Sequence, residues 1–324
     1  MCRVSPTGFR DDSGIRLFMV FLSLVALGVA KPAPARSLLL DGALVGGSTV
    51  VAVGERGAII SSSDSGVSWK SLPSPTKETL TGVSFADDQV GWVVGHGGTV
   101  LATTGGGQTW TRQLLTESVD TSFLDVLALD ARTAIAIGAF GTTRLTRDGG
   151  QTWAAPTPID QEPHLNRIVQ DLRGALWIAG EAGTLLTSSD RGESWSPAET
   201  VGYEGSLYGL LPLPEGGLLV HGLRGHLFLR EKQRGSWQAS QVEQPVMLAA
   251  SCRLRTGVIL MAGAARWFFI SHDQGRSFSR LPLPVTSAVA ELLEMPDGGI
   301  LALGEAGAIR LEIPTSSPPG SSAR

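Results

Sequence analysis

The sequence has almost no cysteine: of its 324 residues only Cys2 and Cys252 carry a thiol. Cys2 belongs to the N-terminal leader described below, and no apolar run precedes it, so it does not fit a lipoprotein acceptor. With Cys252 alone in the rest of the chain, an internal disulfide and a cysteine-based zinc site are both excluded. Cys252 lies in the apolar run 247–254, and we interpret it as a small buried residue rather than a nucleophile.

The sequence also lacks a cluster of positive charge. It has 26 Lys and Arg residues against 30 Asp and Glu residues, and its pI is about 5.8. Nucleic-acid binding requires a concentrated basic face, so we expect no nucleic-acid partner. The five histidines show no spacing typical of metal ligands (His96, His164, His221, His226 and His272). We therefore expect neither a metal nor a cofactor.

Catalytic groups of the glycoside hydrolases are missing or isolated. A sialidase needs an arginine triad and a Tyr–Glu pair, but the only tyrosines are Tyr203 and Tyr208 in one segment. A glycanase needs two carboxylates about 5–10 Å apart across a cleft. Glu55, Glu181 and Glu305 occupy one repeated turn position, and we interpret them as solvated turn charges. The sequence therefore predicts a non-catalytic protein, with a glycoside-hydrolysing or carbohydrate-binding propeller as the alternative.

What the sequence does contain is one unit repeated six times, with the start of a seventh. Each unit has a β-rich run that ends in glycine, a second β-rich run, and a turn followed by an aromatic residue. The glycines recur every 41–43 residues (Gly54, Gly95, Gly138, Gly180, Gly222, Gly263 and Gly304). In six units an aromatic residue follows 15 residues later (Trp69, Trp110, Trp153, Trp195, Trp237 and Phe278). This period predicts a β-propeller with one blade per repeat, forming a single domain over residues 37–313.

Within a repeat the spacing predicts four strands. In the second unit we expect them at residues 80–85, 91–94 and 99–103, with the fourth beginning at Trp110. The turn before the fourth strand has the Asp-box pattern S/T-x-D-x-G-x-S/T-W. Its acid is kept in four units (Asp64, Asp148, Asp190 and Asp273). An Asp side chain can accept hydrogen bonds from the backbone of such a turn, so we predict that these aspartates have a structural role.

The seventh repeat stops after its third strand, at Ile313, and has no aromatic hairpin. We expect the segment Ser37–Leu40 to supply the missing fourth strand of the last blade, which would leave no open edge. The predicted fold is therefore all-β: a seven-bladed propeller of four-stranded blades whose ring is closed by the N-terminal strand.

Both chain ends differ in composition from the repeats. Arg3, Arg10 and Arg16 precede the apolar run 17–30, which predicts a signal peptide over residues 1–30. Residues 31–36 then lead to the first strand, and the Pro- and Ser-rich tail 314–324 is expected to be disordered. Whether the leader is cleaved or kept as an anchor, we expect the propeller to lie in the periplasm or elsewhere outside the cytoplasm.

The units GWVVGHGGTVLATTGGGQTW and AIAIGAFGTTRLTRDGGQTW resemble the photosystem II assembly/stability factor family. Its blades share the pattern G-x-x-G-T-[ILV]-x-x-T-x-D-G-G-x-[ST]-W. The resemblance implies an exported protein-binding scaffold that helps assemble a membrane-associated complex. The client is left open, and a transporter or envelope complex is as compatible as a photosystem. We expect the scaffold to be a monomer with a membrane-embedded or membrane-associated protein partner.

A partner surface is expected where the turns between second and third strands meet the blade-to-blade connections, because both lie on one face of a propeller. Turn residues on this face are Arg56, His96, Phe140, Glu181, Arg224 and Glu305, and the connections add His164, Arg167 and Tyr203. Arginine and aromatic residues are typical of protein-recognition surfaces. The run Trp267–Phe269 is a second candidate, either as core packing between blades or as an exposed aromatic patch.

Overall fold

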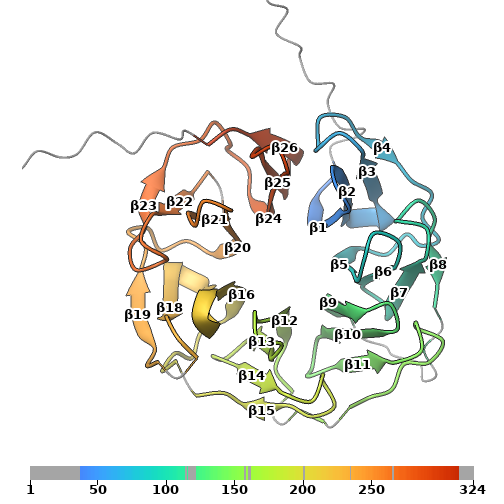
Figure 1. Cartoon of the computed structure of the whole chain (residues 1–324), viewed down its shortest axis with the longest axis horizontal. Coiled ribbons are helices and arrows are strands. Elements are labelled where there is room, and N and C mark those ends of the chain that lie inside the picture. Colours follow the sequence, from blue (N-terminus) through green and yellow to red (C-terminus); the bar gives the residue numbers. More distant parts are fainter. Residues whose placement is uncertain are drawn as a thin grey trace, which may run out of the picture. The chain divides into compact units, whose positions relative to one another are not determined.

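The computed structural model describes residues 37–313, apart from residues 114, 116–121, 157, 160–161, 200, 234 and 265. The predicted signal peptide, residues 31–36 and the tail 314–324 lie outside the described residues. The described chain forms seven antiparallel sheets around a central axis (Figure 1). The prediction of an all-β, seven-bladed propeller is confirmed. No helix in this part of the chain is both long and apolar enough to cross a membrane.

Consecutive strands build each blade from the centre outward. The first two blades contain β1 (Leu39–Val45), β2 (Thr49–Gly54), β3 (Ile59–Ser62) and β4 (Lys70–Ser71), then β5 (Leu80–Phe85), β6 (Gly91–Gly95), β7 (Thr99–Thr103) and β8 (Thr111–Arg112). The third has β9 (Phe123–Asp130), β10 (Thr133–Gly138) and β11 (Thr143–Thr146). The fourth has β12 (Leu165–Gln170), β13 (Leu176–Gly180), β14 (Leu185–Ser188) and β15 (Ser196–Pro197).

The last three blades follow the same order. The fifth contains β16 (Leu207–Leu213), β17 (Gly217–Gly222), β18 (His226–Arg230) and β19 (Gln238–Gln241). The sixth contains β20 (Leu248–Arg253), β21 (Ile259–Gly263), β22 (Phe268–Ser271) and β23 (Ser279–Leu281), and the seventh β24 (Val289–Glu294), β25 (Ile300–Gly304) and β26 (Gly307–Leu311). Three short 3₁₀ turns accompany them: η1 (Glu55–Gly57), η2 (Pro214–Gly216) and η3 (Leu223–Gly225).

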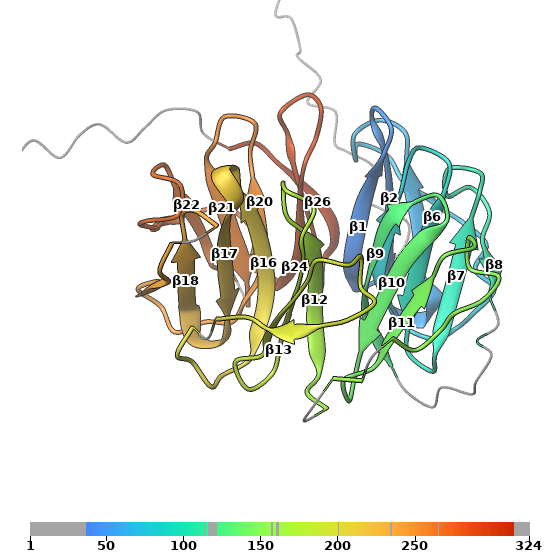
Figure 2. The same cartoon turned by 60° about the horizontal axis from the view of Figure 1, so that its bottom comes forward.

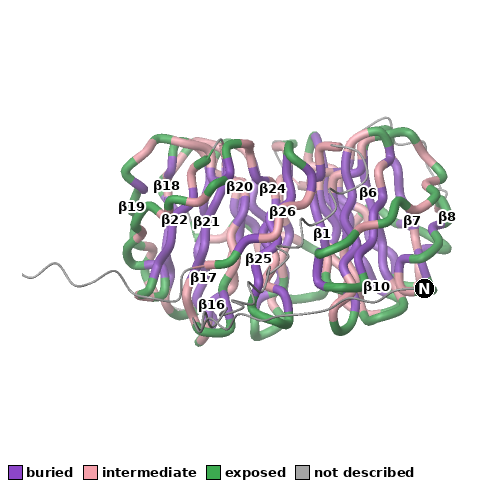
Figure 3. Tube along the Cα trace, turned by 90° about the horizontal axis from the view of Figure 1, so that it is seen from above, coloured by how far each residue is buried: buried purple, intermediate pink, exposed green. Residues whose placement is uncertain are grey.

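The core of the propeller lies between blades rather than inside one sheet. Val51 and Val53 of β2, for example, pack against Leu80 and Val83 of the next blade, and Trp110 covers them from outside. Second strands such as β10 are buried along their whole length because blades cover both of their faces. Figure 3 shows burial concentrated in the strands, with exposure at the turns and at outer strands such as β19.

The predicted closure of the ring by Ser37–Leu40 is wrong. Leu39 begins β1, the innermost strand of the first blade, and β1 pairs with β2 from Leu39 to Val45. The segment that was expected to be a spare strand therefore leads into an ordinary inner strand. The seventh sheet contains three strands within the described residues, and the outermost strand of the third blade is reduced to a bridge between Leu145 and Ala154. Four-stranded sheets form the other five blades.

Among the described residues, side chains join the first blade to the seventh. Leu39 and Ile60 of the first blade pack with Leu301 and Leu303 of the seventh. Arg310 Nη1 also donates a hydrogen bond to the backbone oxygen of Ser65, across the same junction. Within residues 37–313 as described, apolar packing therefore joins the first and seventh blades, and the two blades share no strand there.

Candidate functional site

One end of the propeller gathers the turns between second and third strands beside the connections that enter each inner strand. In every blade a turn N–H donates a backbone hydrogen bond to the carbonyl just before the inner strand, as Glu181 does to His164 at 2.9 Å and Glu305 to Ala288 at 3.1 Å. We call this end the turn face. The seven equivalent hydrogen bonds place turns and connections on one surface, as the strand order requires.

Three predicted residues of the turn face share one backbone geometry. Arg56, Phe140 and Arg224 each have a φ of 55°, in the left-handed region, and all three are exposed. The side chain of Phe140 is 64% exposed, which is unusual for so large an apolar group. The edge of the Phe140 ring meets the His164 ring with centroids 4.8 Å apart, and His164 Nδ1 lies 3.7 Å from Glu181 Oε2. Phe140, His164 and Glu181 therefore form one cluster across the third and fourth blades.

Other residues of the predicted set have structural contacts. Glu55 Oε1 accepts the Leu38 N–H at 3.3 Å, and Glu305 Oε2 accepts the Ala288 N–H at 3.1 Å. Each glutamate therefore holds the start of the inner strand of its own blade. Tyr203 is half-buried: its hydroxyl donates to the Leu223 carbonyl at 3.2 Å, and burial raises the pKa of the phenol. His96 is exposed on the second-blade turn.

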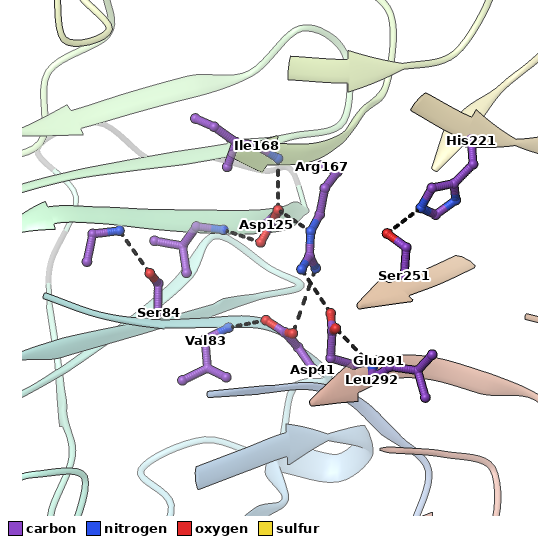
Figure 4. Close-up of polar contacts among 12 residues, drawn as sticks. Asp41, Val83, Ser84, Asp125, Arg167, Ile168, His221, Ser251, Glu291 and Leu292 are labelled. Atoms are coloured by element: carbon purple, nitrogen blue, oxygen red, sulfur yellow. Dashed lines mark hydrogen bonds and ion pairs between the residues drawn. The ribbon is translucent and has the colours of Figure 1, made fainter. Parts of the chain in front are cut away.

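Arg167 does not lie in a connection, as the sequence analysis placed it. It belongs to β12, because the strand already starts at Leu165, and its side chain points into the centre of the ring (Figure 4). Its guanidinium contacts carboxylates from three other inner strands. Nη2 lies 2.9 Å from Glu291 Oε2, Nε lies 3.6 Å from Asp125 Oδ2, and Nη1 lies 3.8 Å from Asp41 Oδ1. We call these four residues the channel cluster.

The three carboxylates of the channel cluster are almost completely buried, with side chains only 6–7% exposed, whereas Arg167 is 33% exposed. Asp41 and Asp125 also accept backbone N–H groups of neighbouring blades. Burial raises the pKa of Asp41 and Asp125, although the nearby guanidinium opposes this effect. Glu291 is the main cause of a raised pKa for Arg167. One arginine thus connects four blades.

Sequence reasoning did not identify the acids of the channel cluster. The available signal was their position: each member is the third residue of an inner strand. The seven residues at this position are Asp41, Gly82, Asp125, Arg167, Gly209, Ala250 and Glu291. Charges at four equivalent positions of a ring must converge, because all inner strands face the same axis.

A neutral histidine joins the fifth and sixth blades beside this cluster (Figure 4). His221 is fully buried, with Nδ1 3.0 Å from the Leu248 carbonyl and Nε2 2.9 Å from Ser251 Oγ. Burial lowers the pKa of His221 to about 4, so the ring is uncharged at neutral pH. Among the described residues, no group of three His, Cys, Asp or Glu side chains is arranged to hold a metal ion.

The four repeated aspartates hold their turns in one way. Asp148 accepts hydrogen bonds from the N–H and the hydroxyl of Thr152, at 2.9 and 2.6 Å, and Asp64, Asp190 and Asp273 do the same with a serine four residues on. For Asp148 the hydrogen bonds from Thr152 lower the pKa to about 2. All of the donors come from the aspartate's own turn, so the contacts are structural.

The run Trp267–Phe269 packs between blades. Phe268 and Phe269 are each only 2% exposed and join different interblade cores. Trp267 is half-buried, stacks on Phe269 with centroids 6.2 Å apart, and lies under the guanidinium of Arg280. The interpretation as an exposed aromatic patch is therefore wrong.

Comparison with known proteins agrees with the repeat pattern. Residues 31–161 match the family model described as photosynthesis system II assembly factor YCF48. The chloroplastic photosystem II stability/assembly factor HCF136 of Cyanidioschyzon merolae (strain NIES-3377 / 10D) is 37% identical over 70 residues, which are 20% of this chain and 16% of that relative. The resemblance to photosystem II assembly factors is confirmed. The match thus spans about a sixth of the length of HCF136.

Solved structures share the fold over almost the whole propeller. A structure described as YCF48 bound to D1 peptide has a TM-score of 0.72 at 21% identity and covers 86% of this chain and 94% of its own. YCF48 from Cyanidioschyzon merolae has a TM-score of 0.71 at 18% identity, covering 86% and 96%. The WD40 β-propeller domain of Doa1 is similarly close, with a TM-score of 0.67 at 14% identity, covering 85% and 92%. At these identities the structures establish the fold alone.

Proposed function

We propose that this chain is an exported, non-catalytic scaffold that binds a protein partner on the turn face and assists the assembly of a membrane-associated complex. The observation that carries this proposal is the common exposed, left-handed position of Arg56, Phe140 and Arg224 on three blades. Two cations and one aromatic anchor are thereby presented on one face, away from the interblade core. Such residues contribute much of the binding energy in protein interfaces.

The known relatives point in the same direction. They are described as assembly or stability factors rather than enzymes, and one of the similar structures holds a D1 peptide on YCF48. For the present chain we expect a polypeptide client with a carboxylate for the arginines, because guanidinium groups bind carboxylates in a fork-like geometry. A photosystem, a transporter or an envelope complex would each fit. Glu55 and Glu305 bond to backbone groups of their own blades, so no observation favours glycoside hydrolysis.

Reversing the charge of the turn face is expected to abolish partner capture without unfolding the protein. The variant Arg56→Glu/Arg224→Glu loses two anchors of about 2 kcal/mol each, so its affinity should fall at least ~100-fold. Both side chains are exposed, so the circular dichroism spectrum should not change. The measurement is capture of membrane proteins from solubilised membranes, with the bound partner identified and its affinity then determined.

A matched control reverses two arginines at the opposite end of the blades, Arg132→Glu/Arg253→Glu, and leaves the turn face intact. Capture by the control should equal that of the unmodified protein. If the turn-face variant captures the same partner as well as the control does, the binding site lies elsewhere.

We also propose that the propeller functions outside the cytoplasm, because the leader has basic residues followed by an apolar run. Expressed with its leader, the protein should appear in the periplasmic or membrane fraction, and the cleaved form should begin at Lys31. Cell fractionation with N-terminal mass analysis measures this. A majority of the full-length protein in the cytosol would contradict export.

A further inference from the structure

The channel cluster contains three carboxyl groups but only one guanidinium (Figure 4). If every group were ionised, the cluster would carry a net charge of −2, from three negative charges and one positive charge. His221 beside it supplies no second cation at neutral pH, because burial lowers the pKa of its ring to about 4. An uncompensated charge that water does not reach is costly, and a buried carboxyl group usually avoids this cost by keeping its proton. The charge count therefore points to a proton within the cluster.

Outside the channel cluster, no charged group faces Asp41 from the strands around it, as far as residues 37–313 are described. Its own strand β1 packs mainly against β2, β5, β24 and β25. β2, β5 and β25 contain no titratable side chain. β24 contributes Glu291 to the cluster, whereas the other acid of this strand pairs with Arg255 at 3.3 Å. The remaining charges near Asp41 are the two members of the cluster on β9 and β12.

Two of the three carboxyl groups are well supplied with hydrogen-bond donors. Asp125 accepts the backbone N–H of the next residue at 2.8 Å and that of Ile168 at 2.9 Å. Glu291 accepts the backbone N–H of the next residue and a hydrogen bond from Arg167 Nη2, both at 2.9 Å. Each of these hydrogen bonds stabilises the ionised form of the carboxyl group that accepts it. Asp125 and Glu291 therefore favour the charged state more than burial alone would allow.

Asp41 has fewer donors than the other two acids. Among the described residues its carboxyl group accepts one hydrogen bond, from the Val83 N–H to Oδ2 at 2.7 Å. Its Oδ1 lies 3.8 Å from Arg167 Nη1, which is the longest of the three ion-pair distances in the cluster. Burial raises the pKa of Asp41 well above its ordinary value; Arg167 opposes this effect, and the charges of Glu291 and Asp125 reinforce it. Asp41 is therefore the member of the cluster that keeps a proton most readily.

We propose that Asp41 is a pH-sensitive switch in the centre of the propeller: it holds a proton at pH 6, where an exposed aspartate is ionised, and releases it as the pH rises further. Without this proton, a second uncompensated negative charge lies between the inner strands of four blades. Between the unfolded and the folded pKa of Asp41, the folded protein binds one proton more than the unfolded chain, so its stability falls as the pH rises. The switch goes beyond the proposed function, because it lies inside the ring and not on the turn face.

Carboxyl carbon NMR of protein labelled at its aspartates detects the proton directly. The Asp41 signal, assigned by its absence in Asp41→Asn, should have the shift of a protonated carboxyl group at pH 6. It should move to the shift of a carboxylate only at higher pH. Asp87 provides a control on the surface, because the backbone N–H groups of Val90 and Gln89 lower its pKa. The Asp87 signal should already be that of a carboxylate at pH 6.

The pH dependence of unfolding provides the second test. Asparagine keeps the size of Asp41 and an acceptor for the Val83 N–H, but it cannot ionise. The equilibrium constant for unfolding of the unmodified protein, divided by that of Asp41→Asn, should rise about tenfold from pH 5 to pH 6, since unfolding releases one proton in this range. The corresponding ratio for Asp87→Asn should stay constant. Every other titrating group is shared by the compared proteins, so its contribution cancels in each ratio.

Two results would overturn the proposal: a carboxylate signal for Asp41 at pH 6, and a ratio for Asp41→Asn that stays constant from pH 5 to pH 6. A ratio that rises for Asp125→Asn but not for Asp41→Asn would also overturn it, because the proton would then belong to Asp125.

A further measurement does not depend on the folding of Asp41→Asn. The Val83 N–H donates to Asp41, so its amide resonance in the unmodified protein reports the charge of that carboxyl group. This resonance should titrate above pH 6, and a titration that is complete below pH 5 would contradict the proposal. The Arg56→Glu/Arg224→Glu variant should give the same result, so loss of partner capture and loss of the switch are distinguishable.

Discussion

Replacing Arg167 by methionine is expected to lower the free energy of unfolding by about 3–5 kcal/mol, one of the two largest effects of a single substitution that we expect in this protein. The change leaves Asp41, Asp125 and Glu291 buried without their cation, and removal of one partner from a buried ion pair has a cost of this size. Methionine keeps most of the side-chain length, so the lost charge dominates the effect. Chemical denaturation at pH 7 measures it.

The pH dependence separates this explanation from simple loss of packing. Burial already raises the pKa of Asp41 and Asp125 in the folded protein, and removing Arg167 raises both further. A carboxyl whose pKa is higher in the folded than in the unfolded state favours folding increasingly as the pH falls through its folded pKa. The Arg167→Met variant should therefore regain stability relative to the unmodified protein between about pH 7 and pH 5. An equal deficit at both pH values would contradict the electrostatic explanation.

An exposed ion pair provides the control for Arg167. Arg191 pairs with Asp130, the last residue of β9, and both side chains are about half exposed. Exposed pairs contribute about 0–1 kcal/mol, because water and salt screen them. Arg191→Met should therefore change the free energy of unfolding by less than about 1 kcal/mol at either pH.

The repeat period predicted the fold because every blade of a propeller has the same local structure and packs against its neighbours in the same way. Each blade needs a glycine where its second strand ends, and the added Cβ of Gly95 would lie 2.2 Å from the carbonyl oxygen of Thr79. The same close approach recurs at the other repeat glycines, so the period is visible in the sequence. The aromatic positions were equally regular, because each aromatic fills the same space between adjacent blades.

Ring closure and the channel cluster could not be read from the period in the same way. The segment at Leu39 was assigned to the wrong blade because the first inner strand and a spare fourth strand both appear as short apolar runs. Arg167 was assigned to the connection before β12 rather than to β12 itself, because residue type defines the boundary between a connection and a strand poorly. Its carboxylate partners are distant in sequence, and Glu291 is 124 residues away. Their meeting depends on the ring geometry, which local pattern does not encode.

The candidate partner face was predictable in its location but not in its contacts. A strand order of four antiparallel strands forces the turns and connections together, and Arg56, Phe140 and Arg224 lie on that face. In the sequence, Glu55 and Glu305 occupy turn positions next to these residues. Glu305 was therefore assigned to the same recognition surface. Only the side-chain geometry shows that Glu55 and Glu305 bind backbone N–H groups of their own blades.

Replacing Trp153 by alanine is expected to destabilise the protein by about 3–5 kcal/mol, far more than replacing the aspartate of the same turn. Trp153 is only 3% exposed and packs with Trp92 and Phe123 between the second and third blades. Its removal leaves a cavity that rigid neighbouring strands cannot fill. Trp153 Nε1 also donates to Gln113 Oε1 at 3.0 Å, so the substitution leaves that amide oxygen without its donor. Trp153→Phe should destabilise the protein much less than Trp153→Ala, since phenylalanine occupies the equivalent position in the sixth blade as Phe278.

Asp148→Ala should destabilise by only about 1 kcal/mol, the value of a local hydrogen-bonded cap, because its donors come from its own turn. The pKa of Asp148 is lowered to about 2 in the folded protein, so its contribution is present above the unfolded pKa near 4 and is lost as the pH falls through 2. The difference between Asp148→Ala and the unmodified protein should therefore shrink below about pH 3. Denaturant unfolding of Asp148→Ala and Trp153→Ala tests which substitution destabilises the protein more. If Asp148→Ala destabilised it more than Trp153→Ala, Asp148 would have to stabilise something beyond its own turn.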